Sequence, residues 1–215
     1  MAVTVRERAS LTVRSLVFLV AINAIGVGVA LMVEADLGVA PNDVMNTGLA
    51  DTLGWQVGTA AWLTAGIAMV LSWILGRRPR PATVLGGVIV GFAINAAIDV
   101  IPTPDPLGLR MAYLAAGLLI VWTAITGIVS ADVGAGPLEL LMLAFMDKGA
   151  PITLARWGLE LGLLGIGLAF GGHAGFGTIL FAGLTGPVLA FTLPRATAIL
   201  GTDLSQPTEI AAAGP

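Results

Sequence analysis

The sequence lacks cysteine, and it has a single histidine and few charged residues. The absence of cysteine excludes disulfides, thiolate nucleophiles and cysteine-held metal centres, and one histidine leaves little for any other zinc or iron site. Charged residues make up 11% of the 215 residues, against about 25% in soluble domains. We therefore exclude a water-soluble globular domain, and we expect neither a metal ion nor an organic cofactor.

Basic charge is too scarce for a nucleic-acid-binding protein. Ten lysines and arginines stand against thirteen aspartates and glutamates, which gives a formal net charge of −3. Phosphate binding needs a basic face, so no nucleic-acid partner is expected. The P-loop, HExxH, GxSxG and CxxC motifs are absent as well, and no paired nucleophile and base is visible. We therefore expect that the protein is not an enzyme.

Long apolar segments dominate what remains. Hydrophobic residues make up 57% of the chain, and six stretches approach the roughly 20 residues that a helix needs to cross a hydrocarbon core of about 30 Å. These stretches cover residues 15–34, 56–75, 82–101, 111–131, 152–170 and 176–193. They predict an all-helical membrane protein with six transmembrane helices, which form one domain over residues 1–197 in contact with the lipid bilayer.

The positions of the basic residues predict how this domain is oriented. Arginine and lysine are held on the cytoplasmic side of a membrane. Most of the basic residues precede the first segment, follow the second, lie around the start of the fifth or follow the sixth, whereas Arg110 alone is clearly outside. With six crossings both termini are cytoplasmic, and residues 198–215 are expected to form a short disordered tail there.

The chain contains an internal repeat. Residues 35–44, ADLGVAPNDV, align with residues 131–140, ADVGAGPLEL, at a constant offset of 96. Each half, about 14–104 and 108–197, is predicted to form a long helix, an Asp-x-Gly-x-x-Pro turn, a short helix and two further long helices. Three crossings are an odd number, so the two halves are predicted to lie upside down relative to each other, as in many secondary transporters.

The turn in each half suggests how the short helix begins. Gly38 and Gly134 are free to take a positive φ and end the long helix, and Pro41 and Pro137 suit the first position of the next one. Helices of about 10–14 residues are too short to span the bilayer. We expect these two to be either re-entrant or interfacial, since non-helical backbone survives at membrane depth only against protein or a water-filled cavity.

These motifs resemble the YczE/YyaS/YitT family of bacterial integral membrane proteins. The family pattern has LG-x-x-P-W-D-V in the first half, LG-x-G-P-x-D in the second, R-x-x-x-E in the fifth span, and G-x-G-T and GP near the end. This chain has LGVAPNDV at 37–44, VGAGPLEL at 133–140, RWGLE at 156–160, GFGT at 175–178 and TGP at 185–187. Asn42 replaces the family's Trp, and Glu139 replaces its Asp. The resemblance implies a multi-pass protein of the bacterial plasma membrane with a transport or an accessory role.

Arg156 and Glu160 are the sharpest candidates for a functional site. Four residues apart on a helix, they share a face, and Glu160 lies about 12 Å past the cytoplasmic end of its segment. A charge near the bilayer centre costs roughly 2.5–3.5 kcal/mol, so the two side chains should neutralise each other inside the bundle. They form either a substrate or proton site, or an ion pair that locks helix packing while Arg156 reaches to the interface.

Four further acidic residues lie in and just before the two short helices. Asp43 and Glu139 either point into a cavity where these helices converge or stabilise the helix N-termini. Asp36 and Asp132 precede the glycine turns. They either stabilise the turn or stand near paired helix N-termini that hold an anionic group.

Asn95 and Asp99 complete the candidates for a substrate or proton pathway. They lie four residues apart on one face of the third segment, where asparagine usually serves as a hydrogen-bonding contact between membrane helices.

The whole pattern predicts a transporter of a small solute or coupling ion, which works by alternating access around a midplane site between inverted repeats. The alternative is a non-transporting membrane accessory or assembly protein that acts through a membrane partner or as a homo-oligomer.

Overall fold

Helices make up almost the whole of the described chain. The structure is a computed structural model that describes residues 8–202, without the side chains of 152 and 153. Within that range it contains eight α-helices and no strand, which confirms the all-helical prediction. The helices are α1 (Leu11–Ala35), α2 (Pro41–Leu53), α3 (Val57–Ile74), α4 (Pro81–Ile98), α5 (Leu107–Ala131), α6 (Pro137–Asp147), α7 (Ile152–Ala169) and α8 (Phe176–Leu200).

Five helices of the described range, α1, α3, α4, α5 and α8, are long and apolar enough to cross a membrane. Large apolar side chains such as Val20, Ile74 and Ile179 are exposed on them, as expected of surfaces that meet lipid. The remaining predicted crossing, the fifth along the chain, falls on α7, which is not among these five described helices, so the count of six stays a prediction. α8 continues to Leu200, three residues into the tail predicted over 198–215, and the part of that tail beyond residue 202 lies outside the described residues.

The two short helices begin where the prolines predict, but the long helices before them end differently. Pro41 and Pro137 occupy the first turns of α2 and α6. The residues that cap α1 and α5 in the left-handed conformation are Asp36 and Asp132, with φ of 49° and 48°, and Gly134 has no positive φ. Gly38 does take a positive φ, of 102°, but it follows the cap. The expectation that these two glycines end their helices is therefore wrong. Aspartate tolerates this conformation because its short polar side chain makes local hydrogen bonds, and each aspartate here also meets an arginine.

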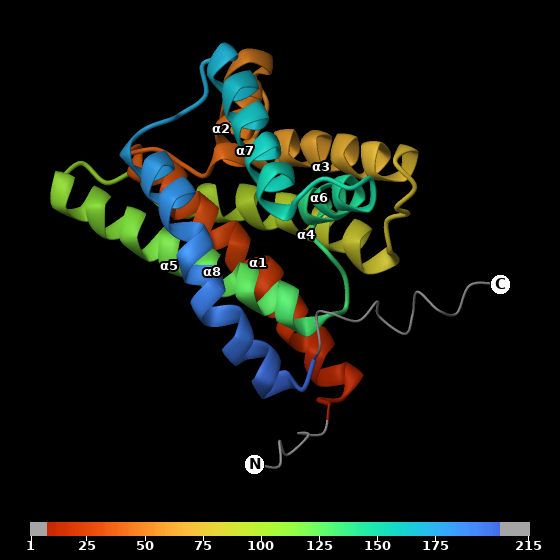
Figure 1. Ribbon diagram of the computed structural model, residues 1–215. Helices are drawn as coiled ribbons and strands as arrows, with labels where there is room; N and C mark the ends of the chain where they lie inside the picture. The colour runs from red at the N-terminus through yellow and green to blue at the C-terminus, as the bar shows by residue number, and fades with distance from the viewer. Residues whose placement is uncertain (1–7, 203–215) are drawn as a thin grey trace.

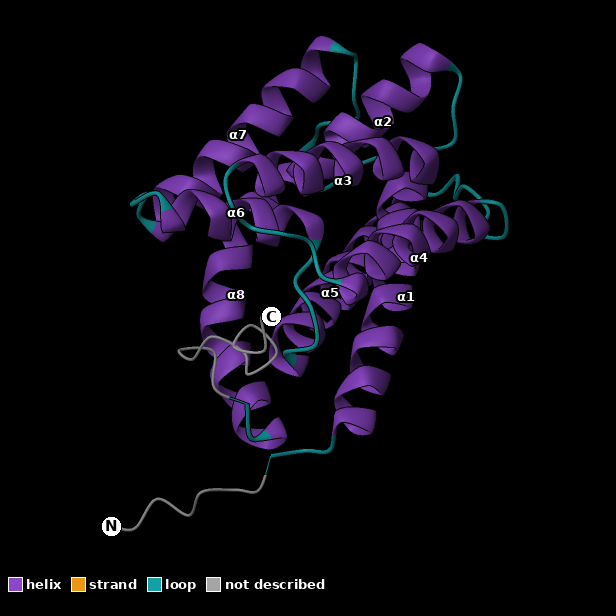
Figure 2. Cartoon of the chain, turned by 90° about the vertical axis from the view of Figure 1, so that its right-hand side faces the viewer, coloured by secondary structure: helices purple, strands orange, loops and turns teal. Residues whose placement is uncertain are grey.

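Helices α1 and α5 form the most extensive pair in the molecule (Figure 1). α4 packs on α1, and α8 packs on α5. α2 packs against α7, and α3 packs against α6. Figure 2 shows α2 and α7 at the upper end of the molecule, with α1 and α8 extending to the lower end. One pairing has no counterpart among the described residues: α3 packs along α4, whereas α7 does not pack along α8.

Small residues let α1 and α5 approach closely. A β-carbon at Gly117 would lie 2.8 Å from the carbonyl oxygen of Gly28, too close for a side chain. Around this crossing Met32, Leu114 and Val121 are almost fully buried. In lipid, close packing of this kind holds helices together, because the hydrocarbon tails are as apolar as the side chains. The α1–α5 pair is therefore the close-packed centre on which α4 and α8 rest.

Candidate functional site

A cavity of about 190 Å³ lies where the N-terminal ends of α2 and α6 face α1, α3, α4, α5 and α7. Most of its wall is apolar and includes Ile22, Val90 and Ile125. The polar residues that line it are Asn42, Asp43, Asn46, Thr64, Thr83, Glu139, Arg156 and Glu160. Four candidates from the sequence, which lie on α2, α6 and α7, thus surround one space: Asp43, Glu139, Arg156 and Glu160.

The first half contributes a chain of hydrogen bonds that begins at Asp43. Asn46 Nδ2 donates to Asp43 Oδ1 at 3.0 Å, and Thr64 Oγ1 of α3 donates to Asn46 Oδ1 at 2.8 Å. Asp43 is only 6% exposed. Burial raises the pKa of Asp43, on the short helix α2, to about 6, although hydrogen bonds from Asn46 and Asn42 act in the opposite direction. The carboxyl group can therefore gain or lose a proton near neutral pH.

The second half contributes an arginine between two glutamates. Arg156 Nε donates to Glu160 Oε1 at 2.7 Å, one turn further along α7. Arg156 Nη1 lies 3.6 Å from Glu139 Oε1, at the start of α6. One positive charge thus faces two negative charges, and the arginine links the short helix to the long one.

Two buried polar atoms of the cavity lining have no hydrogen-bond partner among the described residues. They are Asn42 Oδ1, on α2, and Thr83 Oγ1, on α4. Thr83 is only 1% exposed. A buried polar atom without a partner is costly, and native proteins leave few of them.

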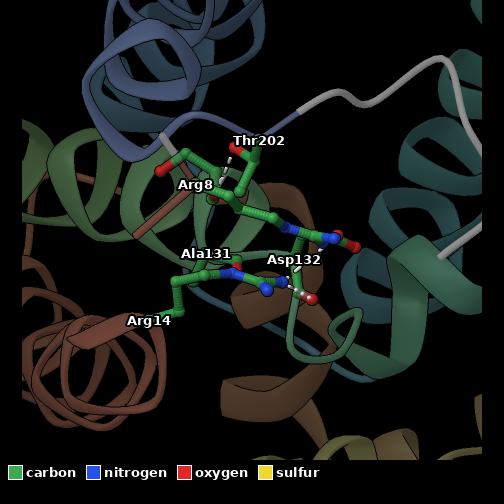
Figure 3. A network of polar contacts seen from close by, with 6 residues as sticks. Arg8, Arg14, Ala131, Asp132 and Thr202 are labelled. Carbon is green, nitrogen blue, oxygen red and sulfur yellow. Dashed lines mark hydrogen bonds and ion pairs between the residues drawn. The ribbon is translucent and has the colours of Figure 1, made fainter. Parts of the chain in front are cut away.

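Asp36 and Asp132 lie elsewhere, at the two ends of the α1–α5 pair. Arg14, near the start of α1, donates from Nε to the carbonyl oxygen of Ala131 at 2.7 Å and from Nη2 to Asp132, which also meets Arg8 (Figure 3). The aspartate and two arginines close the C-terminal end of α5. Neither Arg14 nor Asp132 lines the cavity.

The same arrangement recurs at the opposite end of the pair. Arg110, near the start of α5, donates from Nε to the carbonyl oxygen of Ala35 and from Nη2 to Asp36 Oδ2, both at 2.7 Å. Each long helix therefore uses an arginine of its first turn to close the last turn of the other. We call the two groups around Arg14 and Arg110 the arginine clamps. Because each clamp joins the start of one helix to the end of the other, α1 and α5 run in opposite directions.

Asn95 and Asp99 do not line the cavity. Asn95 Oδ1 accepts a hydrogen bond of 2.7 Å from the backbone N–H of Gly58, so it ties α4 to the start of α3. Asp99 ends α4 and is exposed. These two residues are neighbours on one helix, but the structure does not bring them to the other candidates.

The family model described as "Family of unknown function (DUF6198)" matches residues 12–194. The chain belongs to this family. A relative in Bacillus subtilis, "Uncharacterized membrane protein YczE", is 29% identical over 87% of this chain and 89% of its own. An "Uncharacterized protein" of Haemophilus influenzae is 27% identical over 82% of each chain. No solved structure matches. The predicted resemblance to the YczE family is confirmed, and with its apolar helices this DUF6198 chain is a multi-pass integral membrane protein.

Several residues of the site in this DUF6198 protein were not predicted from the sequence. Asn42, Asn46, Thr64 and Thr83 are uncharged and lie in apolar or short segments, so nothing in a single sequence distinguishes them from hydrogen-bonding contacts. The arginine clamps, by contrast, have a signal in the sequence that could have found them. Arg14 and Arg110 are separated by 96 residues, the same offset that relates Asp36 to Asp132.

Proposed function

We propose that this protein is a small-solute transporter of the bacterial plasma membrane, not an enzyme, and that its solute binds in the cavity between α2, α6 and α7. The observation that carries the proposal is the convergence of Asp43, Glu139, Arg156 and Glu160 on one cavity. Ionisable groups inside a membrane protein are costly and mark substrate or ion pathways. The two unpartnered atoms, on Asn42 and Thr83, add hydrogen-bonding capacity that the protein itself does not use.

An inverted repeat is part of the proposal. α1 and α5 begin 96 residues apart, at Leu11 and Leu107, and end 96 residues apart, at Ala35 and Ala131. They run in opposite directions and exchange the arginine clamps. In transporters built this way the solute site lies near the bilayer midplane, where broken or short helices of the two repeats meet. α2 and α6, which begin at the cavity, would be such helices and would be re-entrant.

The two halves differ in one respect that supports alternating access. α3 packs along α4 in the first half, whereas α7 and α8, in the corresponding place, do not pack along each other within the described residues. The two halves have the same order of helices but pack differently, so each half represents one of two conformations of the same repeat. If the halves exchanged these conformations, the cavity would open toward the opposite side of the membrane.

The proposed topology has six crossings, with α7 as the fifth, and both termini in the cytoplasm. The distribution of arginines and lysines supports this orientation. Arg110 then lies at the outer surface, where its clamp to Asp36 neutralises it.

The absence of native cysteine makes alternating access directly testable. Ala65 of α3 lines the cavity, so Ala65→Cys places one thiol there. We expect a membrane-impermeant maleimide to label this thiol both in right-side-out and in inverted vesicles. Val100→Cys, at an exposed position after α4, is the matched control and should be labelled from one side only. Labelling of Ala65→Cys from a single side, or from neither, would contradict transport and favour an accessory role.

A further inference from the structure

The charges around the cavity are unbalanced. Three carboxylates line it, those of Asp43, Glu139 and Glu160, and the single cation among the lining residues is Arg156. With all four groups ionised, the described lining carries a formal charge of −2. A cation that enters the cavity reduces this charge, whereas an anion increases it.

Arg156 is already engaged by the glutamates. Its Nε donates to Glu160 Oε1 at 2.7 Å, and its Nη1 lies 3.6 Å from Glu139 Oε1. An anionic solute would have to displace one of these carboxylates to reach the guanidinium. Asp43 has no cation beside it in the lining, and its recorded partners are the amides of Asn46 and Asn42.

The helix N-termini do not reverse this preference. The first turns of α2 and α6 face the cavity, and a free helix N-terminus favours an anion. Each of these turns, however, carries its own carboxylate, Asp43 in α2 and Glu139 in α6. A carboxylate of the protein therefore already balances the partial positive charge of each helix end.

The unpartnered atoms also point to a ligand that donates hydrogen bonds. Asn42 Oδ1 can only accept, and its amide nitrogen lies 3.5 Å from Asp43 Oδ1. Thr83 Oγ1, on a side chain 1% exposed, can accept as well as donate. An ammonium group offers three donors and no acceptor, which matches these atoms and the carboxylates.

We propose that the solute is a small organic cation, a protonated amine carried on an apolar body of a few carbons. This inference rests on the proposed function and names the substrate class of the same site. The apolar wall, with residues such as Ile22 and Ile125, would receive the hydrocarbon part. The volume of about 190 Å³ is below the roughly 300–1,000 Å³ of pockets for drug-sized ligands, so the body is short.

Three probes of similar size and different charge test the inference. Purified protein in detergent is titrated by calorimetry with n-butylammonium, butyrate and n-butanol at constant ionic strength. We expect n-butylammonium to bind and the other two to give no saturable heat. Glu139→Gln and Asp43→Asn should each weaken n-butylammonium binding at least tenfold. Asp99→Asn, at an exposed carboxylate outside the cavity, is the matched control and should bind like the wild type.

These binding experiments test the cation site independently of transport. Binding of butyrate in preference to n-butylammonium, or binding of none of the three probes to the folded wild type, overturns it. Equal binding by Glu139→Gln, Asp43→Asn and the wild type overturns it too, since the cation would then sit elsewhere. Helix content and gel filtration show whether each variant is folded. Maleimide labelling of Ala65→Cys needs no ligand, so transport can fail while the cation site stands, or the reverse.

Discussion

Asp43 combines burial with hydrogen bonds that hold its carboxylate in place. Because its pKa is raised to about 6 in the folded protein, the folded state holds the proton more tightly than the unfolded state does. The stability that this proton contributes is complete below about pH 4 and is lost as the pH rises to about 6, by up to roughly 3 kcal/mol. We expect Asp43→Asn to remove this dependence in thermal unfolding in detergent between pH 4 and pH 7.5. Parallel curves for the variant and the wild type would contradict a raised pKa of Asp43 in the folded protein.

Thr83 and Thr64 form a matched pair of threonines in the same cavity. The hydroxyl of Thr83 has no partner within the described range 8–202, whereas that of Thr64 donates to Asn46 at 2.8 Å. Thr83→Val should raise the free energy of unfolding by about 1 kcal/mol, because it removes an unsatisfied buried group, and Thr64→Val should lower it by a similar amount. Chemical unfolding in detergent measures both. A loss of stability in Thr83→Val would mean that its hydroxyl does have a partner in the folded protein.

At the level of helices, the arginine clamps fix the register of α1 against α5. Removing an arginine leaves the last carbonyl groups of the partner helix without a donor, at a cost of about 1.5–3 kcal/mol for charged hydrogen bonds. The Arg14 side chain is 8% exposed and that of Arg110 is 26% exposed, so Arg14→Ala should be the more destabilising substitution. The clamps lie at opposite ends of the pair, and their effects on the free energy of unfolding should add. A double variant no worse than Arg14→Ala alone would contradict independent clamps.

The helices themselves were largely predictable from the sequence, whereas their termini and partners were not. Apolar runs and prolines placed the long segments and the starts of both short helices within a few residues, since length and proline geometry act locally. The exception is the end of α8, which continues seven residues beyond the predicted 193. The left-handed Asp36 and Asp132 were missed because glycine is the residue that usually takes this conformation after a helix. Thr83 lines the cavity because α4 packs beside α6, which no local pattern reveals.

Across the whole molecule, the difference between the halves leads to a prediction about motion. Trp62 of α3 donates from Nε1 to the carbonyl oxygen of Val88 of α4 at 2.9 Å. At the offset of 96, the corresponding positions are Gly158 and Leu184, on α7 and α8. We expect Gly158→Cys with Leu184→Cys to be joined by a short bifunctional maleimide in membranes, because α7 would pack on α8 in the second conformation.

The same cross-link distinguishes motion from a fixed gap. Ala65→Cys is added to the same chain, and its thiol is blocked reversibly before α7 is joined to α8 and unmasked afterwards. The impermeant maleimide should then label it from one side of the membrane only. The single variants Gly158→Cys and Leu184→Cys are the controls for nonspecific reaction. If the pair never cross-links while both single variants react with maleimide, the two helices stay apart and the halves do not exchange conformations.

The first and last described residues of the chain lie side by side. The backbone N–H of Ala9 donates to the carbonyl oxygen of Leu200, and Thr202 Oγ1 donates to that of Ser130, both at 2.8 Å. A short peptide could therefore close the chain into a ring, and the loop between α4 and α5 could be opened to supply new ends. Such a circular permutant would begin with α5 and reach α1 only as its fifth helix. It would keep every helix contact while carrying its free ends at the other end of α5.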